Sequence, residues 1–454
     1  MRRLATLLSL IVAPLSLGLA QMPAQTLTLD EAIRIALERN IDVVQTFNNI
    51  ASADAAVRSA WGDYLPTVSA TGGWTRGQRS SLGNTVYFVP GVGPVEQQSE
   101  TFTTSKQWST GASASLTVFD GLSREANLSS AKSRQAVAER NSERARQAIV
   151  NYVVSGYLNV LRNEQLVKVS EENLKRDQRQ LERITESNRV GALSLADVYR
   201  QQSQVASDEL ELINTQNNYA KASADLVALI GLDPYMTYEF HDASLAMKLD
   251  STDTDATVQQ YRDLIAVTRR AMSARPDFEA ARLNLESASS GVTASMGSYY
   301  PSVSIFGQYG NFSEYLDKLM LNKNYQVAWG FSLRWNLFDG FLREQQVESA
   351  RVQERNAQVT YAQAEKDISV EVRKALLDLE AAKKSWEVSE KALVSAREDR
   401  KIAEERYNLG AGTLLDLLVA NASYVNAEAA RVNAISGFFI ARHNMEYMLG
   451  ERTY

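Results

Sequence analysis

Four stretches of the chain alternate apolar and polar side chains at every second position. In residues 108–118 the even positions are mostly apolar, and the odd positions hold only Ser, Gly and Thr. Residues 325–337 carry apolar side chains at every odd position, and residues 67–75 and 302–309 follow the same pattern over shorter runs. A period of two indicates a β-strand with one apolar face. We therefore expect four strands of about 9–13 residues, long enough to cross a membrane when tilted.

Two environments fit these strands, a soluble sheet packed on helices and a lipid bilayer. The apolar face is rich in aromatic residues, as in membrane strands near the lipid headgroups; these residues are Trp74, Trp108, Tyr325, Trp329 and Trp335. Small and hydroxyl-bearing residues on the other face suit a water-filled interior, so the membrane is favoured. Open sheet edges are not stable in lipid, and four strands cannot close a barrel. Several chains must then share one barrel, and the pattern alone does not choose between 8 strands from two chains and 12 from three.

Two long segments carry a different period. Residues 121–191 and 340–410 contain no Pro, and Gly156 is the one Gly between their ends. Each predicts a single helix of roughly 100 Å, at about 1.5 Å per residue. Apolar residues recur every seven positions, a repeat that predicts coiled-coil packing. They are Val153, Val160, Val167, Leu174 and Leu181 in the first segment and Val372, Leu379, Trp386 and Leu393 in the second.

The chain is an internal duplication. The segment 118–122 (Val-Phe-Asp-Gly-Leu) returns at 337–341 as Leu-Phe-Asp-Gly-Phe, and 190–194 returns at 409–413 with the same spacing. Repeated order at a fixed offset predicts two copies of one structural unit. We place the first repeat at 21–235 and a linker with the second repeat at 236–454. Asp120 and Asp339, each followed by Gly, are expected to cap the long helices.

The N-terminus and the composition place the protein outside the cytosol. Residues 1–20 combine a basic start, a short apolar run and small final residues, as a secretory signal peptide does. No later segment offers about 18 consecutive apolar residues, the length of a membrane-spanning helix. The chain has no Cys, which excludes disulfides and a lipid-modified Cys. The net charge of −6 argues against nucleic acid as a partner.

No motif for catalysis, a cofactor or a metal is present. The only two histidines are His241 and His443, so no pair has metal-ligand spacing. The sequence lacks a glycine-rich phosphate loop and a Gly-x-Ser-x-Gly motif. It predicts a conduit or a structural element rather than an enzyme.

The features in this order resemble the TolC-type outer-membrane efflux proteins over essentially the whole mature chain. They are a signal peptide, two repeats, Tyr-Leu-Pro at 64–66, Phe-Asp-Gly at 119–121 and Val-Gly-Ala-Leu-Ser at 190–194. The resemblance implies a mainly α-helical chain that gives four strands to a trimeric 12-stranded barrel in the outer membrane. The long helices would continue this barrel as an α-helical coiled-coil barrel into the periplasm. The implied function is the passive exit duct of a tripartite efflux or type I secretion system.

The resemblance also assigns the two turns at the helical tips. They would meet a periplasmic adaptor protein, which links the duct to an inner-membrane pump. The expected docking residues are Val190, Gly191, Ala192 and Leu193 in the first turn and Leu409, Gly410, Ala411 and Gly412 in the second. Asp197, Tyr407 and Asp416 match the residues that close the pore, with Tyr407 donating a hydrogen bond to Asp197. Gly412 and Val419 stand where a well-known relative has an Arg and a second acid, which implies a weaker closure. Asp197 and Asp416 could also be simple N-caps.

Two other classes of function fit the sequence less well. A trimeric coiled-coil stalk or adhesin would carry a head domain, for which there is no sequence here. A soluble helical scaffold would need neither the signal peptide nor the alternating strands. The nature of the cargo, whether drug, metal ion or protein, is left open by the sequence.

Overall fold

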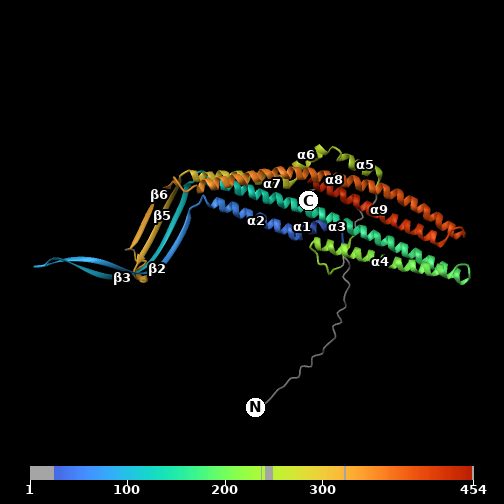
Figure 1. Cartoon of the computed structure of the whole chain (residues 1–454), viewed down its shortest axis with the longest axis horizontal. Coiled ribbons are helices and arrows are strands. Elements are labelled where there is room, and N and C mark those ends of the chain that lie inside the picture. The colour runs from blue at the N-terminus through green and yellow to red at the C-terminus, as the bar shows by residue number, and fades with distance from the viewer. Residues whose placement is uncertain (1–24, 237, 241–248, 322–323, 452–454) are drawn as a thin grey trace, which may run out of the picture. The chain divides into compact units, whose positions relative to one another are not determined.

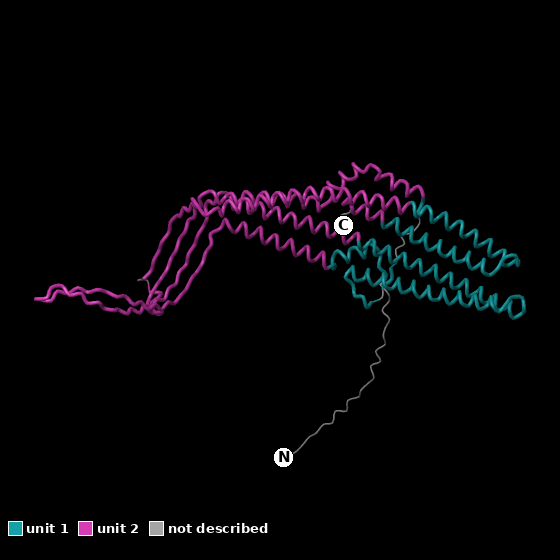
Figure 2. Tube along the Cα trace, in the orientation of Figure 1, with its two compact units in different colours: residues 1–40, 152–250, 384–440 teal, residues 41–151, 251–383, 441–454 magenta. Residues whose placement is uncertain are grey.

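The computed structural model describes residues 25–236, 238–240, 249–321 and 324–451. The expected signal peptide, residues 1–20, lies outside the described residues. The chain divides into two compact units, shown in Figure 2. Unit 1 contains residues 1–40, 152–250 and 384–440, and unit 2 contains residues 41–151, 251–383 and 441–454. Each unit therefore combines segments from both sequence repeats.

Two pairs of helices dominate the chain (Figure 1). Helices α3 (Ser123–Arg189) and α8 (Leu342–Asn408) have 67 residues each, and α4 (Leu195–Leu229) and α9 (Leu414–Met448) have 35 each. Equivalent helices thus have identical lengths in the two halves of the chain. Within the described ranges, no helix combines the length and the hydropathy that a bilayer span requires.

The remaining elements are short. Unit 1 contains α1 (Leu29–Arg39) and a parallel two-stranded ribbon of β1 (Gln25–Leu27) and β4 (Tyr238–Phe240). The Tyr157 hydroxyl donates to the Leu27 carbonyl at 2.9 Å, which fixes this ribbon on α3. Unit 2 contains helices α2 (Ile41–Gly62), α5 (Ser251–Gln260), α6 (Leu264–Ala274) and α7 (Pro276–Met296), together with the 3-10 turns η1 (Gly297–Tyr299) and η2 (Leu316–Lys318).

Unit 2 holds a four-stranded antiparallel sheet in the order β2, β3, β5, β6. Its strands are β2 (Thr67–Val89), β3 (Gly93–Phe119), β5 (Ser302–Ser313) and β6 (Tyr325–Arg334). The register confirms the predicted faces, because apolar positions pair with apolar positions: Leu116 lies opposite Ile305, and Ile305 lies opposite Phe331. On the other face the hydroxyls of Thr67 and Ser115 lie 2.8 Å apart, as do those of Ser69 and Ser113.

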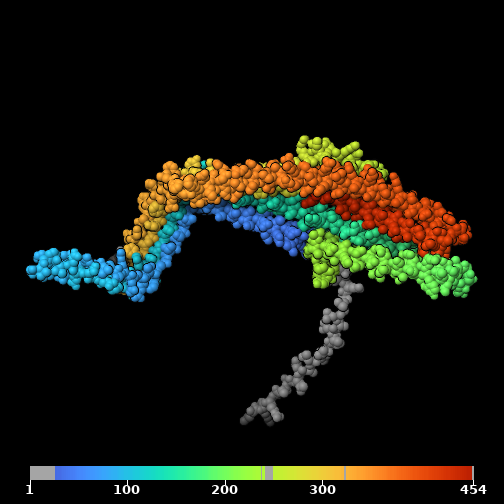
Figure 3. All heavy atoms as spheres, in the orientation of Figure 1, coloured from blue at the N-terminus to red at the C-terminus, as the bar shows by residue number. Residues whose placement is uncertain are grey.

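Residues 76–107 are polar and contain Pro90, Gly91 and Pro94, so the sequence predicts an exposed loop between two strands; this prediction is wrong. β2 and β3 continue through this segment as one hairpin, from the pair Thr67–Ser115 to the pair Val89–Gly93. Gly91 and Gly93 have positive φ values of 92° and 93° and make the turn. The segment is polar, but its Thr, Val, Tyr and Phe residues favour strands. Figure 3 shows the hairpin projecting past β5 and β6.

The helical interior follows the heptad prediction in part. Val153, Val160, Val372, Leu379, Trp386 and Leu393 are buried. Toward the end of α3, however, Val167, Leu174 and Leu181 are only half-buried. The buried positions there are polar, namely Ser170, Asn173, Asp177 and Gln180. The reason is that α4 also presents polar residues on its buried face, Gln201, Asp208 and Thr215.

Each long helix follows its strand through two consecutive left-handed residues. These are Gly121 and Leu122 before α3, with φ values of 71° and 70°, and Gly340 and Phe341 before α8, both at 69°. The predicted N-cap role of Asp120 and Asp339 is wrong, because the helices begin three residues later. Asp120 instead pairs with Arg124 at 3.2 Å, and Asp339 pairs with Arg343 at 2.8 Å. The Arg124 guanidinium also donates to the last carbonyls of β3, which ties strand to helix.

Candidate functional site at the helical tips

The two helical hairpins of unit 1 end in turns of the same geometry. Gly191 has a φ of 78° and Gly410 a φ of 73°, the left-handed conformation that ends many helices. The amide of Ala192 donates to the Ser187 carbonyl, and that of Ala411 donates to the Arg406 carbonyl, both at 2.8 Å. These bonds, with those from the glycine amides, form a Schellman motif at each tip. The predicted docking residues therefore occupy equivalent positions in two rigid turns.

The returning helices α4 and α9 also begin alike. Ser194 is the N-cap of α4, and its hydroxyl donates to Asp197 at 2.7 Å while accepting from the Asp197 amide at 3.2 Å. Thr413 plays the same part for Asp416, at 2.8 Å and 3.2 Å. Asp197 and Asp416 are thus not N-caps themselves but acids at the third helical position, and Asp416 also accepts from the Thr413 amide at 3.1 Å, which completes a capping box. Sequence reasoning missed Ser194 and Thr413, although the spacing Ser/Thr-x-x-Asp marks such a box.

A small apolar cluster brings the two tips together. Its buried members are Ile184, Val198 and Leu414, and the half-buried Leu181, Leu193, Tyr407 and Leu418 pack against them. The cluster contains side chains from all four long helices and from the first turn. The turns are therefore coupled by packing, and a change in one hairpin must disturb the other.

Tyr407 lies in this cluster without its expected partner. No described residue forms a hydrogen bond with its buried hydroxyl. Burial raises the pKa of Tyr407, and the nearby Asp197 carboxylate raises it further. Asp197 is already engaged by Ser194 and by Arg200, whose guanidinium lies 3.2 Å away. The chain thus places the predicted gate pair close together but does not form the predicted bond within one copy.

Asp416 is exposed and remains ionised at neutral pH. Its Oδ2 accepts from the Thr413 amide at 3.1 Å and from the Thr413 hydroxyl. These bonds stabilise the carboxylate and lower the pKa of Asp416 below its usual value. The site therefore presents a fixed negative charge at the second tip.

The family model of the outer membrane efflux proteins matches residues 32–232 and 267–451. The chain belongs to this family. It is 25% identical to protein CyaE of Bordetella pertussis over 89% of this chain and 80% of that protein. It is also 25% identical to the toluene efflux pump outer membrane protein TtgC of Pseudomonas putida, over 94% and 83%. The crystal structure of VceC from Vibrio cholerae has the same fold, with a TM-score of 0.74, 22% identity and coverage of 93% and 96%.

The tips of this efflux protein expose apolar surface in solution. Leu409 is 83% exposed, and Val190, Leu195 and Leu415 are exposed beside it. A Cβ added to Gly191 or Gly410 would meet no atom within 4 Å, so the outer side of each turn is open. Gly412 differs, because a Cβ there would lie 3.2 Å from that of Arg406. A side chain at this position would require its neighbours to move by a few tenths of an ångström.

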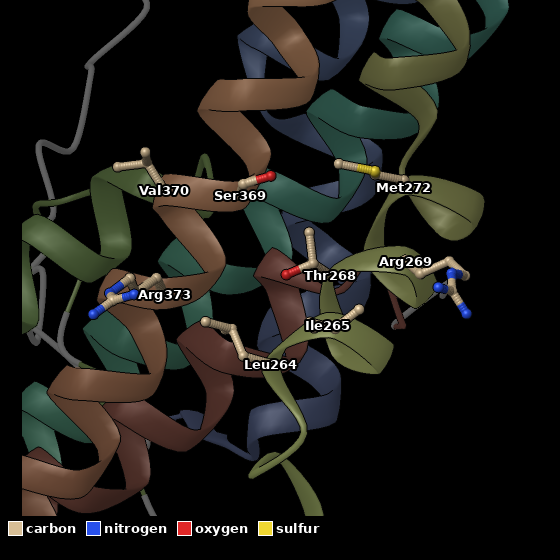
Figure 4. Close-up of a pocket in the computed structure, with 8 residues that line it drawn as sticks. All are labelled: Leu264, Ile265, Thr268, Arg269, Met272, Ser369, Val370 and Arg373. Atoms are coloured by element: carbon tan, nitrogen blue, oxygen red, sulfur yellow. The ribbon is translucent and has the colours of Figure 1, made fainter.

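Unit 2 of this efflux protein contains a separate apolar groove between α6 and α8, with a volume of about 500 Å3 (Figure 4). Ile265, Met272 and Val370 line it, and Arg269 and Arg373 point to opposite sides. Nothing in it resembles a catalytic group. In the part of the chain that the structure describes, no three acidic, His or Cys side chains converge as metal ligands. The tips therefore remain the candidate functional site.

Proposed function

We propose that three copies of this chain form a passive exit duct, with a barrel in the outer membrane and helical tips that dock on a periplasmic adaptor and its inner-membrane pump. Each sequence repeat would contribute two strands and one helical hairpin. The observation that carries the proposal is the sheet: most of its apolar residues share one exposed face, and among the described residues its edge strands β2 and β6 are unpaired on their outer sides. Lipid tolerates no such edges, so further copies must pair with them.

The internal duplication predicts how one copy meets the next. Within the chain β3 of the first repeat pairs with β5 of the second, placing Ser115 opposite Phe306. Beyond that pair, a Cβ on Gly121 would lie 2.4 Å from the Gly297 carbonyl, so the junction is packed. The equivalent residues, Gly340 and Gly62, have open space around them in a single chain. The same junction would form between β6 of one copy and β2 of the next, with Arg334 opposite Thr71.

Disulfide crosslinking tests this arrangement on a chain that has no native Cys. Thr71→Cys combined with Arg334→Cys should form bonds between copies in isolated membranes, and the bands should stop at three chains. Bonds within one copy are excluded, because β2 and β6 lie at opposite edges of the sheet, about 14 Å apart at ~4.8 Å per strand. A matched control, Thr71→Cys with Ser332→Cys, shifts the register by two residues and should react far less. Equal reaction of both pairs, or a ladder beyond three chains, would refute the interface.

We further propose that Asp197, Tyr407 and Asp416 hold the resting duct closed. The Tyr407 hydroxyl is buried in one copy and would find its acceptor only in the closed assembly. Such a bond to a charged group contributes about 1.5–3 kcal/mol. Three Asp416 carboxylates around the axis would favour cations in the pore.

Conductance in planar bilayers measures this closure. Tyr407→Phe should raise the resting conductance, because the ring still packs but the hydroxyl is lost. Asp416→Asn keeps an acceptor for the capping box and should reduce cation preference and block by divalent ions. Unchanged conductance in the first variant together with unchanged selectivity in the second would place the gate elsewhere.

A further inference from the structure

Two carboxyl groups face each other inside unit 1, between α3 and α4. Asp177 is 2% exposed and Asp208 is 7% exposed. Their carboxyl groups lie within hydrogen-bonding reach of one another. Among the described residues, nothing donates a hydrogen bond to Oδ1 of Asp177 or Oδ2 of Asp208. Two ionised carboxylates so close together repel each other, so this arrangement favours the uptake of a positive charge.

The surrounding side chains do not supply that charge directly. The pair lines a polar cavity of about 310 Å3 between α3, α4 and α9. Of the described residues that line it, none is Lys or Arg, and Glu211 on α4 adds a third acid. The lining residues of α9 are Leu418, Asn421, Ala422, Val425 and Asn426, which carry no charge.

Two arginines and several amides lie nearby: Arg400 of α8 lies over the Tyr424 ring of α9, 4.2 Å from the centroid, and the Nε of Arg176 is buried with no partner among the described residues. Arg176 on α3 donates to the Asn173 Oδ1 at 2.8 Å, and its guanidinium lies over the Tyr424 ring of α9, 5.6 Å from the centroid. The Gln204 amide donates to Oδ1 of Asp208 at 3.0 Å. The Gln201 amide donates to the backbone carbonyl of Asp177 at 3.2 Å. These contacts partly stabilise the two carboxylates. Among the described residues, Oδ1 of Asp177 and Oδ2 of Asp208 still have no donor.

The second repeat shows that the fold does not need these polar groups. The residues 219 positions after Asp177, Gln201 and Asp208 are Ala396, Ala420 and Ala427. Helices α8 and α9 nevertheless have the same lengths as α3 and α4 and end in the same turn. Small apolar residues therefore satisfy the packing of this hairpin, and the acid pair is a property of the first hairpin alone.

We propose that Asp177 and Asp208 form a proton-binding site that holds α3 to α4 while one proton is shared between them, and that release of this proton loosens the first hairpin. A shared proton converts two repelling acceptors into a donor and an acceptor. Burial, together with the contact with Asp208, raises the pKa of Asp177 to about 7. The proton is thus bound and released near neutral pH, so a modest change of pH alters the fraction of sites that hold it. The site lies within the first hairpin, away from its tip turn. A link between this site and duct opening rests on the proposed function, whereas proton binding does not.

The direction of the pH effect follows from linkage. A carboxyl whose pKa is raised by folding binds more protons in the packed state than in the open state. The α3–α4 contact should therefore be tightest on the acid side and should weaken as pH rises from about 4 to about 7. Each pH unit within this window changes the opening equilibrium by up to about tenfold.

Hydrogen–deuterium exchange on the purified assembly tests the proposal without requiring transport. Exchange rates are corrected for the intrinsic effect of pH. When the pH is raised from about 5.5 to about 8, the protection factors of amides in residues 170–184 and 201–215 should fall by roughly tenfold or more. Asp177→Asn supplies a permanent donor and should remove this change. The double variant Asp177→Ala with Asp208→Ala copies the second repeat and should also be insensitive to pH. Helix α7 (Pro276–Met296), which lies in unit 2 and does not line the cavity, serves as the internal control.

Three results would overturn the proposal. The first is a wild-type hairpin whose protection is independent of pH. The second is an equal pH response in Asp177→Asn, which would assign the effect to other groups. The third is restored protection at alkaline pH on addition of Ca2+ alone, which would make the cavity a metal site instead. Failure of the exit-duct function would appear separately, in the crosslinking pattern.

Discussion

Arg275→Met is expected to destabilise unit 2 strongly, whereas Arg282→Met should have little effect. Arg275 is buried at 4% exposure between Asp277 at 2.6 Å and Glu371 at 2.7 Å. Its guanidinium also faces the Met448 carbonyl at the end of α9. Met preserves the length of the side chain but removes the cation from Glu371 and leaves Asp277 with Arg144 alone, at 3.6 Å. Because both carboxylates are partly exposed, we expect a cost of about 1.5–3 kcal/mol, the contribution of hydrogen bonds to charged groups.

Arg282 is the matched control because it lies on α7, whose N-cap residue is Arg275, and also has two acidic partners. Its contacts with Glu279 at 2.8 Å and Glu286 at 3.5 Å are exposed, and such pairs contribute about 0–1 kcal/mol. Thermal unfolding of the purified variants compares the two directly. Burial alone would raise the pKa of Asp277, but Arg275 and Arg144 lower it overall. Wild-type stability should therefore fall as pH drops below about 4. Equal unfolding midpoints for the two variants would contradict a structural role for the buried pair.

The second large effect is expected at the tips. Ala192→Trp combined with Ala411→Trp should abolish export while leaving the assembly intact. Both alanines are exposed beside open glycine turns, so the indole rings would project outward without disturbing the apolar cluster behind them. Two bulky groups on each chain would prevent close approach of an adaptor. We expect at least a tenfold loss of transport, which corresponds to about 1.4 kcal/mol of docking free energy.

The control for this experiment is Ala192→Ser with Ala411→Ser, which changes the same positions without adding bulk. Cells that carry each variant are compared for export of a pump substrate, and the inter-copy disulfide reports on assembly. Normal export by the Trp variant would show that the adaptor binds elsewhere. Loss of the disulfide would show that the substitutions act on assembly, which would contradict a docking role.

The period of the hydrophobic pattern predicted secondary structure reliably where each face of a strand or helix lies in a single environment. The two-residue pattern identified four strands and their apolar face, since the strand pleat leaves no other arrangement for alternating side chains. It failed at residues 76–107, where Pro90, Gly91 and Gly93 form only the turn of a long polar hairpin. Strand pairing there depends on backbone hydrogen bonds, which leave no apolar signal in the sequence.

The seven-residue pattern had a different limit. It identified the buried residues of the first half of α3 and of α8, but it counts only apolar residues. Beyond Asn163 the buried side chains of α3 are mostly polar, and their partners on α4 are polar as well. Polar residues of α3 that pack against polar residues of α4 can be recognised only when the positions of both helices are known. Similarly, the sequence located Tyr407 and Asp197 at the tips but could not show that Ser194 and Arg200 already engage Asp197.

The hydroxyl groups that cross-link β2 and β3 have a consequence for permeation. Thr67, Ser69, Ser113 and Ser115 pair with one another, so each donor or acceptor that they offer is already partly used. The stretch of wall that these four residues form carries no charge and offers little free hydrogen-bonding capacity, and Arg334 of β6 adds a cation elsewhere on the same face of the sheet. A solute that moves along these residues would meet no strong binding site. Conduction requires that binding be weak enough for release. Selectivity for cargo is then set before the solute reaches the sheet, and the last part of the route favours speed over discrimination.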